Sequence, residues 1–286
     1  MRKKNSYFKY RPLYHARADG KREPHPFTKS IFEKAEIYYA APKDFNDPFD
    51  CNLRLHSNGS SDAEWESLFR SMMPPDGEIR RLLEQAIQEM WWKTKPDIAN
   101  SLGKEHHERV YKDSSVFCLS RKGNSIPMFS YYSDSHQGIA IQFDFDDPEV
   151  PCGFSPEQIL SPIGPTPIAF SDVDYFKDFP ELNYHRLQGK TQLIKSLLFT
   201  KHEDWSHEEE FRIVRHHVAA GNVQFAKRLL TGVIFGCKTT GADMELVKSW
   251  LQEWPTDVVL AKATQATDKF ELKIQEVEVV RAKTKN

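Results

Sequence analysis

Along this 286-residue chain, hydrophobic and polar positions alternate in some stretches with a period of two residues and in others with the period of a helix. The first pattern is typical of a strand with one buried face, and the second of an amphipathic helix. The patterns predict strands at residues 7–10, 36–40, 115–119, 138–143, 210–214, 229–235, 258–262 and 270–280. They predict helices at residues 27–35, 189–199 and 241–254, with a short segment of undefined type at 127–132. Strands interspersed with single helices indicate a mixed α+β fold.

Residues 57–112 interrupt this order with two helical stretches, 63–69 and 78–92, separated by the turn-forming sequence PPDG. Apolar positions at helical spacing in the second stretch are expected to pack in the core: Ile79, Leu82, Leu83, Ala86, Ile87, Met90 and Trp91. We therefore expect a single α+β domain over residues 1–286, with 57–112 as a helical insertion. The Pro-rich residues 148–167 are expected to form a surface loop.

Composition and charge narrow the class of protein. With 39 Lys and Arg against 41 Asp and Glu, the formal charge is −2, so the whole chain is not a basic nucleic-acid binder. The N-terminal segment is locally basic, either as a solvated arm or as a patch for polyanions: Arg2, Lys3, Lys4, Lys9, Arg11, Arg17, Lys21 and Arg22. Widely spaced cysteines favour reduced thiols over a zinc ribbon or a disulfide framework: Cys51, Cys118, Cys152 and Cys237. No apolar run reaches membrane-spanning length, so we expect a cytoplasmic protein with no membrane partner.

The common catalytic motifs are missing from the sequence. It has no GxGxxG after a strand, no GxxxxGK[ST], no GxSxG and no HExxH, and GCKTTG at 236–241 has the wrong order for a phosphate-binding loop. These absences argue against dinucleotide dehydrogenases, P-loop enzymes, α/β-hydrolases and zincins.

The densest group of ionisable residues is the run WSHEEEFRIV at 205–214. On a strand, a two-residue period places Glu208, Glu210 and Arg212 on one face. Two carboxylates on one strand face repel each other unless a cation compensates them. The run is therefore either an exposed strand with an ordinary ion pair or a functional site.

Four short motifs occur in order: KYR at 9–11, FNDPFD at 45–50, YSDSHQGIAIQFD at 132–144 and WxxExExR at 205–212. Together they resemble the bacterial domain-of-unknown-function family numbered 2971, over residues 7–236. Phe129 and His207 stand where that resemblance leads us to expect Trp and Tyr, and neither departure removes a charged group.

More loosely, the order of these residues is similar to the ADP-ribosyltransferase fold. Members of that fold carry Arg or His on the first strand, Ser or Tyr on a middle strand and Glu near a later one. The runs EFRIV and LLTGVIFG resemble the Glu-bearing strand and the next strand of DNA-modifying toxins of that group. The resemblance implies a split, twisted, mixed or antiparallel sheet.

What this resemblance implies for function is NAD-dependent mono-ADP-ribosyl transfer, with NAD as co-substrate. Glu210 would be catalytic, because breaking the nicotinamide bond builds an oxocarbenium-like charge that a fixed carboxylate stabilises. Glu208 would orient or deprotonate the acceptor. Arg11 would hold the NAD phosphates with its planar fork, and Ser130 or Tyr132 would support the nicotinamide ribose.

Several further residues carry two interpretations. Tyr10 or Tyr131 would either stack on nicotinamide or pack in the core. In FNDPFD, the polar side chains Asn46, Asp47 and Asp50 would either form a turn or line the pocket. Two weaker candidates beside predicted strands are Ser120 and His136, of which the second is more typical of packing.

The resemblance implies that the acceptor is a nucleic acid (RNA or DNA) or a protein. The resemblance alone also implies that the protein acts as a toxin or phage-defence effector, with a possible antitoxin. A metal-dependent nuclease stays open as an alternative because possible ligands crowd together: His202, Glu203, Asp204, His207 and Glu208. Their spacing is not a recognised ligand pattern, and the pairs His106-His107 and His216-His217 diverge on a strand, so no metal site is predicted. A non-catalytic ligand-binding module is the third class.

Overall fold

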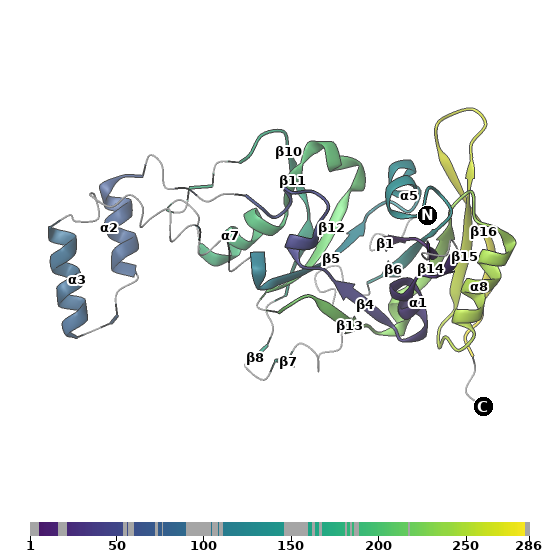
Figure 1. The fold of residues 1–286 in the computed structure, drawn as a ribbon, viewed down its shortest axis with the longest axis horizontal. Helices are drawn as coiled ribbons and strands as arrows, with labels where there is room; N and C mark the ends of the chain where they lie inside the picture. Colours follow the sequence, from purple (N-terminus) through teal and green to yellow (C-terminus); the bar gives the residue numbers. More distant parts are fainter. Residues whose placement is uncertain are drawn as a thin grey trace.

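The computed structural model describes residues 6–16, 22–53, 56, 60–71, 74–75, 77–89, 104, 108, 111–145, 160–161, 164–165, 168–180, 182–183, 185, 189–216 and 218–283. Within them, one eight-stranded mixed sheet has the order β16-β15-β14-β6-β1-β5-β12-β9 (Figure 1). Neighbouring strands are antiparallel except β14 and β15, which are parallel. A mixed α+β fold with a large sheet is thus confirmed.

The strands of this sheet are β1 (Ser6–Arg11), β5 (Ser114–Ser120), β6 (Ile139–Asp144), β9 (Ile168–Asp172), β12 (Glu210–His216), β14 (Leu230–Phe235), β15 (Val258–Gln265) and β16 (Leu272–Val280). Shorter pairs are β2 (Tyr14–Ala16) with β3 (Arg22–Pro24), β4 (Glu36–Tyr39) with β13 (Gly221–Gln224), β7 (Leu160–Ser161) with β8 (Gly164–Pro165), and β10 (Asp174–Phe176) with β11 (Thr200–His202). The α-helices are α1 (Pro26–Glu33), α2 (Asp62–Ser71), α3 (Glu78–Gln88), α5 (Ile126–Tyr132), α7 (Gly189–Leu198) and α8 (Gly241–Leu251). The 3-10 helices are η1 (Pro42–Asp44), η3 (Glu203–Glu208) and η4 (Lys227–Leu229).

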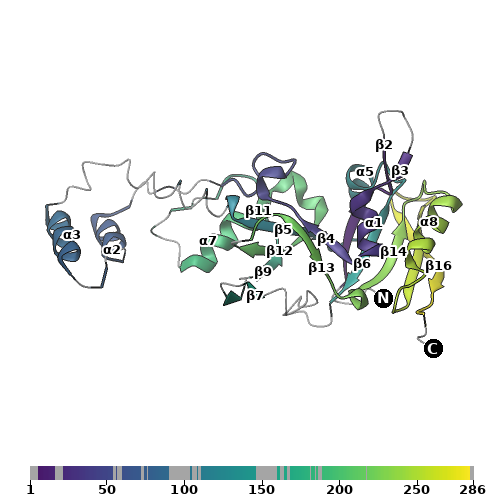
Figure 2. The same ribbon diagram turned by 60° about the horizontal axis from the view of Figure 1, so that its bottom comes forward.

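Helices cover the sheet on both faces. On one face α1 and α8 lie side by side, and the rings of Phe32 and Trp250 lie 5.5 Å apart between them (Figure 2). On the other face α5 packs Met128 and Phe129 against β1 and β6. A third cluster joins α7 to β5 and β12. Because both faces are covered, Ile139, Ala140 and Ile141 of β6 are all fully buried, whereas the sequence pattern predicted one buried face.

The sheet is nearly divided between β1 and β5. On the side away from β5, β1 pairs with β6 over its whole length, from Ser6↔Asp144 to Arg11↔Ile139. With β5 it pairs only at Phe8↔Ser120. Ser120 is the last residue of β5, so from this contact toward Arg11 the two strands run without backbone pairing, and side chains fill the space between them. We call this line between β1 and β5 the seam.

The helices α2 and α3 correspond to the predicted insertion between β4 and β5, and they lie beside each other at one end of the molecule (Figure 1). The apolar stripe on α3 was expected to be buried, and this prediction is wrong for two of its members. Ile79 and Leu82 are 66% and 62% exposed, whereas Ile87 is buried. The reason is that α3 packs beside α2 rather than on the sheet, so much of its apolar stripe stays uncovered. Met90 and Trp91 lie outside the described residues.

Other predicted segments also lie outside the described residues. These are much of the Pro-rich loop 148–167, Cys152, and five basic residues of the N-terminal segment: Arg2, Lys3, Lys4, Arg17 and Lys21. The same holds for His106, His107 and His217. In the described part of the chain, no helix is both long enough and apolar enough to cross a membrane.

Candidate functional site

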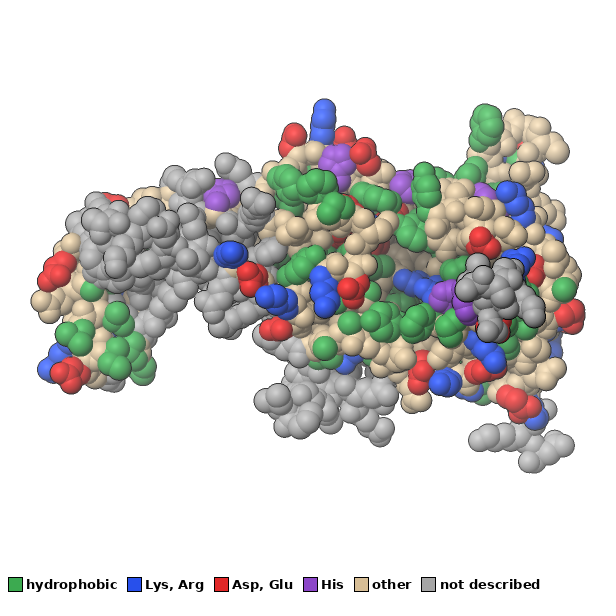
Figure 3. Space-filling model, viewed as in Figure 1, with side chains coloured by type: hydrophobic (Ala, Val, Ile, Leu, Met, Phe, Trp, Pro, Cys, Tyr) green, Lys and Arg blue, Asp and Glu red, His purple; other side chains and the backbone are tan. Residues whose placement is uncertain are grey.

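A cavity of about 570 Å³ opens along the seam, and we call it the first cavity. Its walls come from β1, β5, α1, β4, α5 and the loop after η1, together with Lys201, Glu208 and Glu210. This volume lies within the roughly 300–1,000 Å³ of small-molecule sites. The face that carries α1 and β4 is hollowed near the middle of the molecule, where basic and His side chains appear among hydrophobic ones (Figure 3).

A left-handed turn shapes the acidic side of the first cavity. The strand predicted from residue 210 is confirmed, but the expectation that Glu208 continues its charged face is wrong, because Glu208 ends η3 and β12 begins only at Glu210. Between them Glu209 has a φ of 41°, which turns the backbone sharply. As a result, Glu208 and Glu210 converge on the Lys201 ammonium, with O–N distances of 2.6 and 3.3 Å. The Ser120 hydroxyl fixes the turn by donating to the Glu208 carbonyl at 2.6 Å.

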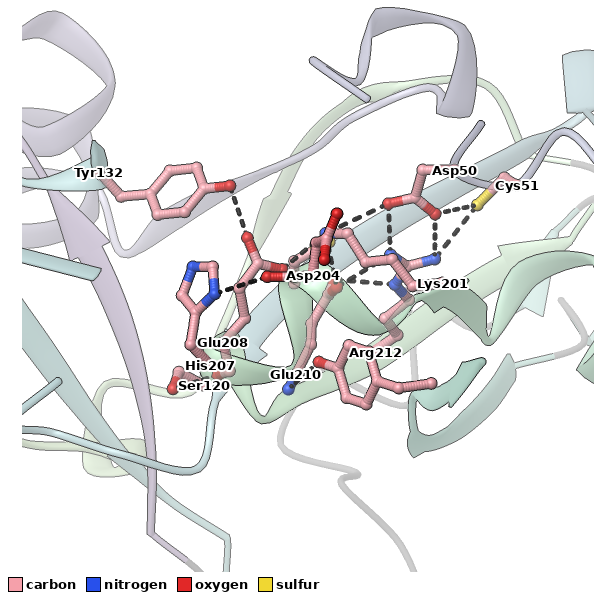
Figure 4. A network of polar contacts seen from close by, with 12 residues as sticks. Asp50, Cys51, Ser120, Tyr132, Lys201, Asp204, His207, Glu208, Glu210 and Arg212 are labelled. Atoms are coloured by element: carbon pink, nitrogen blue, oxygen red, sulfur yellow. Dashed lines mark hydrogen bonds and ion pairs between the residues drawn. The ribbon is translucent and has the colours of Figure 1, made fainter. Parts of the chain in front are cut away.

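Below this turn, Arg212 joins the strand to the FNDPFD loop. Its guanidinium donates to both oxygens of Asp50 at 2.8 and 2.6 Å and to both oxygens of Glu210 at 2.8 and 2.9 Å (Figure 4). It also donates to the Leu198 carbonyl at 2.8 Å. Arg212 is 0% exposed, so the interpretation of an exposed strand with an ordinary ion pair is wrong. Lys201 closes the network at 3.4 Å from Asp50.

The two glutamates differ in their ionisation. Burial alone would raise the pKa of Glu210, but the charges of Arg212 and Lys201 outweigh it and hold the pKa well below its usual range. Burial raises the pKa of Glu208, Glu210 acts in the same direction, and Lys201 offsets only part of this. The Tyr132 hydroxyl donates to the remaining Glu208 oxygen at 2.6 Å. Glu210 is thus held as an anion by Arg212 and Lys201, whereas the pKa of Glu208 is raised.

The opposite side of the first cavity carries two cations. The Lys9 ammonium donates to the Cys118 carbonyl at 2.9 Å, and the Arg11 Nε donates to the Thr28 hydroxyl at 3.3 Å. Burial lowers the pKa of each. Neither forms an ion pair with any residue in the part of the chain that the structure describes. Partly buried cations without a carboxylate partner are suited to binding an anionic group.

Next to Arg11, His25 is held neutral. Its Nδ1 lies 3.4 Å from an Arg11 Nη atom, and burial, Arg11 and His15 lower the pKa of His25 to about 4. A neutral imidazole accepts a hydrogen bond from the guanidinium without competing for an anion. His25 therefore positions Arg11.

The sequence-predicted binding residues divide between the cavity wall and the core. Tyr132 lines the first cavity, as do Arg11 and Asn46. Ser130 is not among the lining residues, and its hydroxyl donates to the Ile126 carbonyl at 3.0 Å and contacts His136 at 2.9 Å. Of the two candidates for the ribose, only Tyr132 therefore reaches the cavity.

Tyr10 is a core residue. It is 4% exposed, its ring meets Phe129 edge-on at 4.9 Å, and its hydroxyl donates to the Lys122 carbonyl at 2.7 Å. Tyr10 also borders the first cavity, but its near-complete burial and its contact with Phe129 favour packing in the core over stacking on a ligand. Tyr131, the other aromatic candidate, lines the cavity and is 71% exposed. The lone His136 packs on Phe129, as its position at a strand start favoured.

The FNDPFD loop fulfils both of its interpretations in different residues. Asp47 forms the turn, because its Oδ1 accepts from the Phe49 amide at 2.9 Å, and it does not line the first cavity. Asn46 and Asp50 do line it, and Asn46 also forms a hydrogen bond with the side chain of Tyr132. The polar side chains were therefore identified correctly, but the sequence did not separate their roles.

Sequence reasoning missed four residues of the first cavity. Lys201 lies at the centre of the acidic network, yet no motif pairs this residue with Glu208 or Glu210 before the fold is known. Lys9 was named only as part of the basic N-terminal segment and of the KYR motif, with no role in the site. Phe27 and Tyr38, 48% and 42% exposed, line the cavity with their rings 5.5 Å apart. Two exposed aromatic residues next to a predicted helix and strand were the available signal.

The proposed ligands of a nuclease metal do not converge. The Nδ1 of His202 lies 3.2 Å from the Asp204 carboxylate. The Nδ1 of His207 lies 2.9 Å from the Asp204 carbonyl oxygen. Among the described residues, no three His, Cys, Asp or Glu side chains gather as metal ligands. Asp50, Glu208 and Glu210 are instead compensated by Lys201 and Arg212.

Comparison with known proteins gives one match. Residues 128–213 match the model of a family described as a protein of unknown function (DUF2971). The chain matches no curated protein and no solved structure. The matched segment runs from α5 to β12, so it contains Tyr132, Lys201, Glu208, Glu210 and Arg212, which form most of the acidic side of the first cavity. The resemblance to family DUF2971 that the sequence motifs indicated is thus confirmed over residues 128–213.

Proposed function

We propose that this protein is an NAD-dependent mono-ADP-ribosyltransferase whose site is the first cavity. The observation that carries the proposal is the opposition of charge across the seam. Lys9 and Arg11, which form no ion pair with another residue that the structure describes, lie on one side, and Glu208 lies on the other with Tyr132 bound to it. A ligand with a diphosphate at one end and a reacting ribose at the other is complementary to this arrangement.

Binding of the dinucleotide would use residues from four elements, β1, α1, β4 and α5. Arg11 and Lys9 of β1 would hold the diphosphate, the first through its bidentate fork and the second as a point charge. Phe27 and Tyr38 would receive the adenine, since both rings are partly exposed at the cavity. Tyr131 would lie against the nicotinamide. The split, twisted sheet of an ADP-ribosyltransferase-like fold is part of the same proposal, and the near-division of the sheet at the seam supports it.

The proposed chemistry moves the catalytic role first assigned to Glu210 onto Glu208, which also keeps its role toward the acceptor. Heterolysis of the bond between ribose C1′ and nicotinamide leaves its electron pair on the departing nicotinamide and positive charge on the ribose. Glu208 stabilises that charge, and it takes the proton that the acceptor loses as the new bond to C1′ forms. Both oxygens of Glu210 are bound by Arg212, so Glu210 acts by holding Lys201 and thereby Glu208.

The test is release of nicotinamide and transfer of label from NAD labelled in its adenylate half. Purified protein is incubated with separate pools of cell protein, RNA and single-stranded DNA. We expect Glu208→Gln to lower the rate by about 100-fold or more, as for loss of one preorganised electrostatic contact. Glu209→Gln is the matched control from the same motif, because its side chain pairs with Lys122 on the surface and does not line the cavity.

Three results would contradict the proposal. The first is that no pool yields nicotinamide. The second is that Glu208→Gln and the unaltered protein react at equal rates. The third is that the protein binds NAD without turnover, which would favour a ligand-binding module. The labelled pool identifies the acceptor as nucleic acid or protein. A role as a toxin or phage-defence effector, with an antitoxin as partner, belongs to the same proposal and rests on the looser resemblance.

A further inference from the structure

A second cavity, of about 560 Å³, lies next to the first. It is bounded by the turn at residues 46–49, the segment that begins with Phe176 of β10, and β11 with the start of η3. The two cavities share only Asn46 and Lys201, and neither Glu208 nor Glu210 lines the second. A group bound there would lie beside the reacting carboxylate without touching it.

Aromatic side chains dominate the wall of the second cavity. Phe49, Phe176 and Phe179 are 59%, 42% and 62% exposed, and the rings of Phe49 and Phe179 lie 5.9 Å apart at 65°. Trp205 completes the wall, with the Lys201 ammonium 4.9 Å from its ring centroid. Over β10 and β11, hydrophobic side chains gather beside acidic and His side chains (Figure 3). Such a group of exposed aromatic rings marks a recognition surface.

The charged residues of this cavity are mainly acidic. Asp47, Asp178 and Asp204 line it, against Lys177 and Lys201. Lys201 is already bound by Glu208 and Glu210, so among the described lining residues Lys177 is the one Lys or Arg without an ion pair, against three carboxylates. This balance favours a cationic ligand over a phosphate-bearing one.

Asp47 supplies the second, independent observation. It is 6% exposed, and while its Oδ1 accepts from the Phe49 amide, its buried Oδ2 has no hydrogen-bond partner among the described residues. A buried carboxylate oxygen without a donor is costly, and a ligand with N–H groups would satisfy it. Phe49 of the same turn is 59% exposed and lines the same cavity as Asp47.

We propose that the second cavity is a recognition pocket for an arginine side chain of a partner protein. A guanidinium is planar, stacks on aromatic rings and donates several hydrogen bonds to carboxylates, so it matches both the rings and the acidic residues. An ammonium would satisfy the charge but would use the aromatic faces less well. The bound arginine anchors a protein segment beside the first cavity. This inference stands independently of the chemistry proposed for that cavity.

The experiment measures binding of a fluorescent tri-arginine peptide, with tri-citrulline as the neutral peptide of the same shape. We expect tri-arginine to bind and tri-citrulline to bind at least about tenfold more weakly, since charge-assisted hydrogen bonds are roughly twice as strong as neutral ones. Asp47→Asn keeps an oxygen for the Phe49 amide and removes the charge, and it should weaken tri-arginine binding about tenfold or more. Asp268→Asn is the charge-matched control from the exposed turn between β15 and β16, and it should have no effect.

Phe179→Ala provides a second variant, because it removes an exposed ring without changing charge and should also weaken binding several-fold. Equal binding of the two peptides, equal loss in Asp47→Asn and Asp268→Asn, or no binding of tri-arginine would each overturn the proposal. A single-stranded oligonucleotide is tested in parallel. If it binds, is weakened by Phe179→Ala and is strengthened by Asp47→Asn, the cavity recognises nucleobases instead.

Discussion

Replacing Arg212 by Met would break the buried network at its most connected member. The substitution removes six hydrogen bonds: two to Asp50, two to Glu210, one to the Leu198 carbonyl and one to the Cys51 sulfur. Removing one partner of a buried pair costs about 3–5 kcal/mol, because the other charge is left uncompensated. Against the 5–15 kcal/mol typical of a whole domain, this is a large fraction of the free energy of unfolding.

A matched control tests whether the loss of stability comes from the burial of the ion pair or from ion pairing in general. Arg121 forms the same two-point contact with Asp172, at 2.7 and 2.9 Å, but the two side chains are 34% and 59% exposed. Arg121→Met should therefore cost less than about 1 kcal/mol. Urea unfolding at pH 7 measures both variants. Equal losses in the two would refute the argument that the buried network, rather than ion pairing in general, stabilises this fold.

The pH dependence gives an independent check on the same variant. Arg212 holds the pKa of Glu210 below its usual range, so the stability it contributes is present above the ordinary pKa of 4.5 and is lost as the pH falls through the lowered value. In Arg212→Met that contribution is missing at every pH. The difference between the two proteins should be largest near pH 7 and should narrow below about pH 4.5. Adding Asp50→Asn should recover part of the loss at pH 7, because it removes a stranded charge.

Three further predictions concern other parts of the fold. Thr240→Ala, which breaks the capping box at the start of α8, should cost about 1 kcal/mol in urea unfolding, and no change would mean that the cap is dispensable. His25, whose pKa is lowered to about 4, should contribute stability above pH 6.5 that is lost as the pH falls toward 4, and an unchanged pH profile in His25→Gln would contradict this. Gly138→Ala would place a Cβ 2.3 Å from the Arg11 carbonyl oxygen and should cost about 1–3 kcal/mol, whereas Gly221→Ala, with open space around it, should cost little.

Element type was predictable from the sequence where apolar periodicity was strong. The strands β1, β5, β6, β14, β15 and β16 and the helices α1, α7 and α8 all lie at or near the predicted positions. The segment at 127–132 was not assigned a type, and it is helix α5. The strands that were not predicted are β2, β3, β7, β8, β9, β10, β11 and β13. Each has five residues or fewer, and such short segments owe their conformation to pairing with a neighbour, as β11 does with β10.

The candidate site was predictable as a set of residue types but not as a geometry. The motif WxxExExR identified Glu208, Glu210 and Arg212 because three charges recur within five residues. It predicted that both glutamates lie on one strand face. Glu209 instead has a left-handed backbone conformation, and the two carboxylates meet at the Lys201 ammonium. The place of Lys201 in the site and the ion pair between Asp50 and Arg212 arise from contacts between segments that are far apart in the chain. Local sequence patterns do not reveal such contacts.

The seam has a topological consequence. On one side of it lie β1, β6, β14, β15 and β16, and on the other β5, β9 and β12. The described strands alternate between the sides in chain order, from β1 to β5, back to β6, across to β9 and β12, and back again to β14. Neither half of the sheet is therefore a continuous stretch of polypeptide, and no cut in the chain releases one half intact. The chain crosses repeatedly between the two halves, which pair with each other at one backbone position. A ligand that spans the seam would contact both halves and oppose their separation.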